Sequence, residues 1–177
     1  KDGLAGMSYQ AGAVPPFKHH DMVDGPLKVT DVDFGGQHWH SILVGGLGKG
    51  GNRYFALDVT NPSAVTDEAT AASKVLWEFG APQMGFTYGK PIITKLAGNW
   101  VVIVASGYNN VNGVSGDGQG YVYVLDALTG ELKQKITTGG GAYGDSGTPS
   151  GLAQINNYVD NVDIDNTTLR AYGGDVL

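Results

Sequence analysis

One short stretch decides the fold, Ser41–Gly46 (Ser-Ile-Leu-Val-Gly-Gly), and it returns as Val102–Gly107 (Val-Ile-Val-Ala-Ser-Gly). It begins a third time at Leu169–Gly174 (Leu-Arg-Ala-Tyr-Gly-Gly). Each copy is a short apolar run that ends in glycine, which is typical of a strand followed by a turn. A second apolar strand ending in aspartate follows the first two copies, at Arg53–Val59 and Tyr121–Ala127. A unit of several short strands is therefore repeated along the chain.

A proline opens another strand ahead of each copy, and the three prolines, Pro26, Pro91 and Pro149, lie roughly 60 residues apart. A repeat of this length, built from several short strands, is typical of a β-propeller blade. The sequence thus predicts an all-β chain that forms part of a modified β-propeller. We expect a leading loop at 1–22, blades at 23–80 and 86–138, and the start of a further blade at 147–177.

About two and a half blades cannot close a ring, because a closed propeller needs at least four. The chain starts at Lys1 and stops at Leu177, just as the third copy should enter its next strand. We therefore expect the chain to be an excerpt of a larger protein that supplies the remaining blades.

The individual strands are expected from alternation in 27–34 and from short apolar runs elsewhere, bounded by glycine, proline and asparagine. They are 27–34, 39–44, 54–59 and 75–79 in the first unit, and 91–96, 100–106, 121–125 and 131–137 in the second. Only 64–74 favours a helix. The loop 107–120 is longer than its counterpart in the first unit, and such insertions lie on one rim of a propeller, where binding usually happens.

The composition excludes several classes of function. Only 16% of the 177 residues are charged and the net charge is −6, whereas a nucleic-acid surface needs clustered Lys and Arg. No apolar run is long enough to span a bilayer. The absence of cysteine removes disulfides, thiolate metal sites and cysteine catalysis. The 29 glycines fit a chain with many tight turns.

Several short sequence motifs, taken in their order along the chain, resemble those of the propeller domain of the PilY/PilC family. They are Val23–Pro26, Gly45–Gly48, Tyr54–Pro62, Gly89–Pro91, Ser106–Asn110, Gly120–Asp126 and Tyr172–Asp175. The resemblance implies a C-terminal, modified β-propeller on a large exported protein that promotes type IV pilus assembly, opposes retraction and contributes to surface attachment. It implies no catalysis. The implied partners are pilus components such as minor pilins at the tip, and a host or abiotic surface. The implied location is the periplasm, the outer membrane or the cell surface.

An acidic run near the end of the chain is the strongest chemical cluster. Its candidate ligands for calcium are Asp160, Asn161, Asp163, Asp165 and the carbonyl of Thr167, and calcium takes six to eight oxygen ligands. The PilY/PilC resemblance implies an EF-hand-like calcium loop at this place. The family's last acidic ligand, however, falls on Leu169, which has no side-chain oxygen. The alternative is a solvated acidic turn between two strands.

The other polar residues favour structural roles. Asp58 and Asp126 close equivalent strands, which predicts a repeated turn-capping role. His38 and His40 share a strand face, but a metal site would need a third ligand. We expect Tyr54, Tyr121 and Tyr123 to pack between blades. Further polar residues lie in the enlarged loop, where Asn and Asp are common in any case: Asn109, Asn110, Asn112 and Asp117.

Two other functions compete with the pilus propeller. Asp126–Glu131 (Asp-Ala-Leu-Thr-Gly-Glu) resembles the Asp-x-x-Thr-Gly turn of quinoprotein dehydrogenase propellers. The usual tryptophan after that turn is missing, and the matching turn of the first unit, Asp58–Pro62, departs from the pattern. The second alternative is a carbohydrate-binding propeller. Absorbance of a bound quinone and a glycan array would separate these possibilities.

Overall fold

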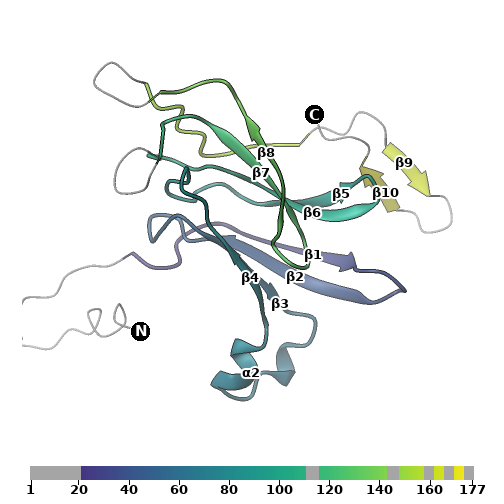
Figure 1. The fold of residues 1–177 in the computed structure, drawn as a ribbon. Coiled ribbons are helices and arrows are strands. Elements are labelled where there is room, and N and C mark those ends of the chain that lie inside the picture. The colour runs from purple at the N-terminus through teal and green to yellow at the C-terminus, as the bar shows by residue number, and fades with distance from the viewer. Residues whose placement is uncertain (1–20, 111–115, 143–147, 158–161, 166–169, 174–177) are drawn as a thin grey trace, which may run out of the picture.

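The computed structural model describes residues 21–110, 116–142, 148–157, 162–165 and 170–173. They form two four-stranded antiparallel sheets that face each other (Figure 1). The first sheet has the order β1 (Leu27–Asp33), β2 (Trp39–Gly46), β3 (Tyr54–Asp58), β4 (Val75–Phe79). The second has the order β5 (Ile92–Leu96), β6 (Asn99–Ala105), β7 (Tyr121–Asp126), β8 (Leu132–Thr137).

Each sheet is a meander, in which every strand pairs with the next one along the chain. A short 3-10 helix, η1 (Pro62–Ala64), and the helix α2 (Glu68–Ala72) lie between β3 and β4. Asp67 caps α2, because its side chain accepts a hydrogen bond from the amide of Thr70 at 2.8 Å. A separate antiparallel hairpin, β9 (Val162–Asp165) with β10 (Arg170–Gly173), follows the second sheet.

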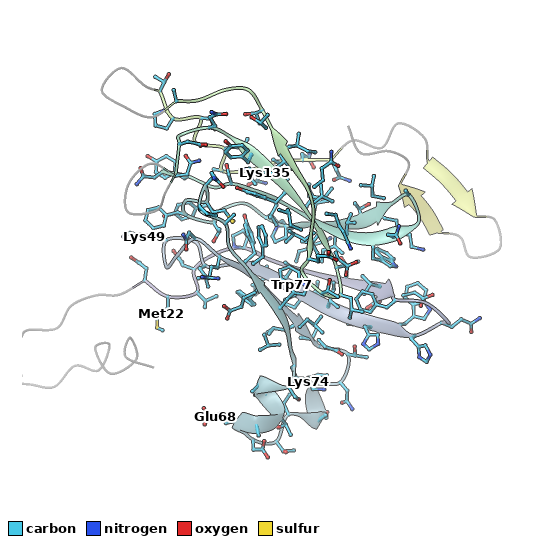
Figure 2. All side chains as sticks on the ribbon, in the orientation of Figure 1. Met22, Lys49, Glu68, Lys74, Trp77 and Lys135 are labelled. Carbon is cyan, nitrogen blue, oxygen red and sulfur yellow. The ribbon has the colours of Figure 1, made fainter. Side chains whose placement is uncertain are left out.

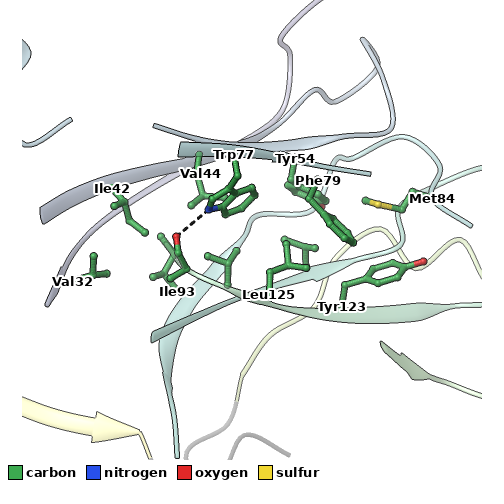
Figure 3. Packing of buried hydrophobic residues seen from close by; sticks show 14 of the residues in the cluster. Val32, Ile42, Val44, Tyr54, Trp77, Phe79, Met84, Ile93, Tyr123 and Leu125 are labelled. Carbon is green, nitrogen blue, oxygen red and sulfur yellow. Dashed lines mark hydrogen bonds between the residues drawn. The ribbon is translucent and has the colours of Figure 1, made fainter. Parts of the chain in front are cut away.

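The hydrophobic core lies between the two sheets (Figure 3). Side chains alternate along each strand, so one face of each sheet is apolar and turns toward the other sheet. The first sheet contributes Val32, Ile42, Val44, Tyr54, Trp77 and Phe79, and the second contributes Ile93, Val102, Val104, Tyr123 and Leu125. Burying one such aliphatic side chain contributes about 1.5–3 kcal/mol, so this contact dominates the stability of the pair.

The outer faces of the two sheets differ. On the second sheet, Val101, Ile103 and Val124 are buried, and Ile155 packs against them. On the first sheet, Leu27, Val29 and Val75 remain 50%, 52% and 46% exposed. The register places all three on the same face as Phe55 and Leu57, opposite the core. The first sheet therefore presents an apolar outer face.

The eight expected strands are present, each within two residues of its predicted bounds, and α2 lies inside the stretch that favours a helix. Sheet β1–β4 falls within 23–80 and sheet β5–β8 within 86–138. The division of the chain into blades at those boundaries stays a prediction. The leading loop 1–22 lies almost entirely outside the described residues.

Candidate functional site

The structure describes the backbone of only two of the five candidate calcium ligands in the acidic run near the end of the chain. Asp163 and Asp165 lie in β9, opposite Tyr172 and Arg170 of β10, and because they are two residues apart they share one face of the hairpin. Asp160, Asn161 and Thr167 lie outside the described residues. We expected a loop or turn throughout 160–167, and this is wrong for 162–165, which form a strand. Val162 and Ile164 alternate with the two aspartates, and this period of two favours a strand.

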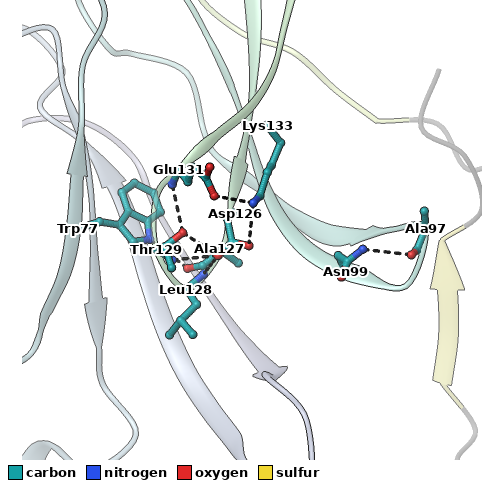
Figure 4. Close-up of polar contacts among 9 residues, drawn as sticks. All are labelled: Trp77, Ala97, Asn99, Asp126, Ala127, Leu128, Thr129, Glu131 and Lys133. Atoms are coloured by element: carbon teal, nitrogen blue, oxygen red, sulfur yellow. Dashed lines mark hydrogen bonds and ion pairs between the residues drawn. The ribbon is translucent and has the colours of Figure 1, made fainter.

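The turn after β7 is organised by one carboxylate (Figure 4). Oδ1 of Asp126 accepts hydrogen bonds from the amides of Leu128 and Thr129, both at 3.0 Å, and from the Thr129 hydroxyl at 3.1 Å. Lys133 Nζ lies 3.9 Å from Oδ2. Burial raises the pKa of the Asp126 carboxyl, but the bonds from Thr129 and Leu128 and the charge of Lys133 outweigh it, so the pKa lies below its usual value. The predicted turn-capping role is confirmed.

The turn after β3 uses Asp58 in the same way. Its Oδ1 accepts hydrogen bonds from the amide of Thr60 at 2.9 Å and from the Thr60 hydroxyl. His40 Nδ1 lies 3.0 Å from Oδ2 of Asp58, so this histidine supports the turn. Within the part of the chain that the structure describes, no three His, Cys, Asp or Glu side chains gather as metal ligands.

A tryptophan from the first sheet is docked into the aspartate turn of the second. Trp77 of β4 donates a hydrogen bond from Nε1 to the Ala127 carbonyl at 3.0 Å, and its side chain is only 6% exposed. Gly130 lies against the indole at φ +70°, and a Cβ there would come within 2.6 Å of the ring. Only glycine fits, because the position is both left-handed and in close contact. The Asp-x-x-Thr-Gly turn thus receives its tryptophan from the neighbouring sheet.

The second sheet lacks the equivalent tryptophan. Trp77 pairs with Ala56, two residues before Asp58, and the residue at the matching place opposite Val124 is Gln134. The resemblance of Asp126–Glu131 to a quinoprotein turn is therefore explained by a contact between sheets, made once in the described residues. Sequence reasoning missed this contact. The available signal was the pair of aromatic residues Trp77 and Phe79, two positions apart in an outer strand whose counterpart, β8, is exposed throughout.

Polar residues of the enlarged loop hold the loop itself in place. Asn110 is fully buried and donates from Nδ2 to the carbonyls of Gln119 at 2.8 Å and Gln83 at 3.1 Å. Asp117 accepts a hydrogen bond from the Tyr121 hydroxyl at 2.6 Å and another from the amide of Gln119 at 3.0 Å. Asn112 lies outside the described residues. Asn110 and Asp117 therefore have the structural role that their loop position suggested.

Loops at one end of the two sheets are joined by hydrogen bonds. The hydroxyl of Thr87 accepts a hydrogen bond from the Leu47 amide at 2.8 Å and lies 3.0 Å from the Arg53 carbonyl, to which it can donate. Phe86 and Tyr108 exchange two backbone hydrogen bonds at 2.7 and 2.9 Å. These contacts run from the β2–β3 loop through 84–88 to the β6–β7 loop. Figure 2 shows Lys49, from the first of these loops, at this end of the molecule.

Comparison with known proteins decides the family. Residues 3–177 match the family model of the PilY1 β-propeller domain. The chain belongs to that family. A type IV pilus biogenesis factor PilY1 homolog of Xylella fastidiosa is 36% identical over 171 residues, which are 93% of this chain and 11% of the relative. Type IV pilus biogenesis factor PilY1 of Pseudomonas aeruginosa PAO1 is 34% identical over 177 residues, which are 98% of this chain and 13% of the relative.

A solved structure gives the same answer. The crystal structure of the Pseudomonas aeruginosa PilY1 C-terminal domain superposes with a TM-score of 0.54 at 33% identity, covering 68% of this chain and 24% of the other. The two antiparallel sheets are therefore part of a PilY1 β-propeller, as the sequence predicted. The chain spans only a small part of its PilY1 relatives. Among the described residues, no helix is long and apolar enough to cross a membrane.

Proposed function

We propose that this chain is a non-enzymatic propeller module of a type IV pilus biogenesis factor, which supports pilus assembly and surface attachment. The match of residues 3–177 to the PilY1 β-propeller domain carries the proposal. The relatives that share this domain are named as type IV pilus biogenesis factors. The proposed partners are minor pilins at the pilus tip and a host or abiotic surface. The proposed location is outside the cytoplasm, in the periplasm, the outer membrane or at the cell surface.

The internal contacts of the propeller support a role as a rigid platform. Asp58 and Asp126 hold the turns, Trp77 fastens one sheet to the other, and Thr87 joins neighbouring loops. Several of the polar side chains that sequence reasoning singled out are thus engaged in building the scaffold. A platform of this kind can present loops to a partner without rearranging, which lowers the entropic cost of binding.

Exchange of the segment in a relative tests the proposal. Residues 3–177 would replace the matching segment of PilY1 in Pseudomonas aeruginosa, and surface pili and attachment to glass would be counted. We expect both to be restored relative to a strain without PilY1. An exchange protein with Trp77→Ala is the matched control, because it keeps every loop but weakens the contact between sheets. A folded, exported exchange protein that restores neither pili nor attachment would contradict the proposal.

The acidic run supports calcium regulation as a second element of the proposal. Asp163 and Asp165 share a face of β9, and with Asp160, Asn161 and the Thr167 carbonyl they would supply oxygen ligands of the type calcium prefers. Leu169 contributes no side-chain oxygen, so the set is one acidic ligand short of the family pattern. Bound calcium would offset the negative charge of the acidic run. If the ion binds one conformation of the hairpin better, it biases the interaction with pilus components.

Calorimetric titration of the full-length protein with calcium tests this element. The double variant Asp163→Ala with Asp165→Ala should lose the binding heat of this site. Glu68→Ala removes an exposed acid in the first turn of α2 (Figure 2) and should leave the titration unchanged. If the double variant bound calcium as the parent does, and pilus assembly kept its calcium response, the acidic run would be an ordinary part of the hairpin.

A further inference from the structure

We propose that a cleft between β1, β5 and residues 154–157 binds an acidic peptide segment in extended conformation. The cleft has a volume of about 340 Å³, and its lining includes Lys28, Lys90, Ile92, Gln154, Ile155 and Asn156. This volume is at the lower end of the range for ligand sites in proteins. None of these side chains takes part in the contacts described above for the aspartate turns or for the joined loops.

The charge of the cleft is opposite to that of the chain. Lys28 and Lys90 line it without any carboxylate, although the whole chain carries a net charge of −6. Among residues 21–110, 116–142 and 148–157, no acidic side chain forms an ion pair with either ammonium group. Lys49 and Lys133, in contrast, pair with Asp21 at 3.1 Å and Glu131 at 2.6 Å. Two lysines that line one cleft of an acidic protein favour a ligand that brings its own carboxylates.

The shape and chemistry of the lining favour a peptide. Ile92 and Ile155 supply an apolar floor, and the carboxamides of Gln154 and Asn156 can both donate and accept, as a peptide backbone requires. β1 and β5 are the first strands of their sheets. The outer edge of β1 has no ladder partner among the described residues, whereas β5 is in contact with β10 without forming a ladder with it. An extended peptide can hydrogen-bond to such an edge. In a strand, alternate side chains point to opposite sides, so a segment of alternating acidic and aliphatic residues fits both the lysines and the isoleucines.

A second cleft of about 470 Å³ provides a contrast. It is lined by Asp33, Asp126, Lys95 and Trp100, among others. Lys95 stands over the Trp100 ring, 5.3 Å from the centroid, so that indole already has a cation on its face. The two carboxylates make this cleft unsuitable for an acidic segment. The lysine cleft has no aromatic side chain in its lining, and this disfavours a sugar ring, which usually stacks on one.

The probe is a fluorescein-labelled hexapeptide of alternating glutamate and leucine, added to the full-length protein and followed by fluorescence anisotropy. A peptide with glutamine in place of glutamate is the control ligand. We expect the acidic peptide to bind, the control peptide to bind at least tenfold more weakly, and the binding to weaken as salt is raised. The proposed function enters this inference at one point only: it suggests that the natural acidic segment belongs to a pilus component. The two tests are therefore independent. The hexapeptide can fail to bind although the exchange protein restores pilus assembly, and it can bind although the exchange protein does not restore assembly.

Four lysine variants locate the site. Lys28→Gln and Lys90→Gln should each weaken peptide binding about two- to fivefold, which is the range for one exposed ion pair, and the double variant about tenfold. Lys74→Gln is the matched control, because Lys74 is half-buried like Lys28 but lies beside α2 (Figure 2), and it should bind as the parent does. Unfolding temperatures within about 2 °C of the parent would show that the variants are folded.

Three outcomes would overturn the proposal. They are no binding of the acidic peptide, binding that Lys28→Gln with Lys90→Gln leaves unchanged, and displacement of the peptide by a polyuronate at lower concentration than by unlabelled peptide. The last outcome would assign the cleft to an anionic polysaccharide. Loss of binding in the double variant with retention in Lys74→Gln would establish the cleft as a peptide site.

Discussion

At the residue scale, Trp77 makes the most consequential contact, because it fills a turn of the second sheet and bonds to the Ala127 carbonyl. Trp77→Phe removes that donor and leaves a void beside Gly130. We expect the free energy of unfolding to fall by about 2–4 kcal/mol, measured by urea denaturation. Trp39→Phe is the control, since Trp39 is 39% exposed and should change stability by less than about 0.5 kcal/mol. An equal loss in both variants would contradict the docking role.

Asp126 gives a second prediction at this scale, on pH. Its pKa is lowered in the folded chain, so its stabilising effect is present above the unfolded pKa of about 3.9 and is lost as the pH falls through the folded value. Asp126→Asn should therefore lower stability by about 1–2 kcal/mol at pH 7, and the gap to the parent should close toward pH 3. Melting temperatures of both proteins between pH 3 and 7 measure this. A gap that is independent of pH would mean that geometry alone, without charge, stabilises the turn.

At the scale of elements, the eight strands could be predicted because most are short apolar or alternating runs that end near glycine, proline or another turn residue. Asp58 and Asp126 were recognisable from their equal places at strand ends. The contact between Trp77 and Ala127 could not be predicted from the sequence, because it joins residues fifty positions apart that only the packing of the two sheets brings together. The strand at 162–165 was not predicted, because its aspartates were interpreted as loop ligands, although Val162 and Ile164 alternate with them as in a strand.

The joined loops supply the prediction for this scale. Thr87→Val keeps the shape of the buried side chain but leaves the Leu47 amide without its hydroxyl acceptor and the Arg53 carbonyl without a possible hydroxyl donor. We expect a loss of about 1–3 kcal/mol and faster amide exchange in the loops 46–53 and 84–88, measured by hydrogen exchange. Thr30→Val, on β1, is the matched control. Unchanged exchange in both loops would show that Thr87 does not join them.

At the scale of the whole molecule, the apolar outer face of the first sheet needs a cover. Leu27, Val29 and Val75 are about half exposed there, beside a groove of about 230 Å³ that Phe55 and Leu57 help to line. In a PilY1 β-propeller, a further sheet would pack on this face as the two described sheets pack on each other. Leu57→Lys should therefore reduce binding of a hydrophobic dye to the 177-residue chain, yet destabilise the full-length protein by about 2 kcal/mol or more. A neutral effect in the full-length protein would mean that the face stays open.

The position of Trp77 also means that its intrinsic fluorescence can report on the contact between the two sheets. An indole that is almost sealed from water, with its Nε1 bonded to a carbonyl, emits at shorter wavelength than a solvated one. Of the other two tryptophans, Trp39 is much more exposed and Trp100 is only partly buried, so Trp100→Phe serves as the background for this measurement. If the two sheets part while each keeps its ladder, the emission of Trp77 shifts to the red and the far-ultraviolet circular dichroism stays constant. Separation of neighbouring sheets under load or on binding a partner can thus be observed apart from unfolding, without any added label.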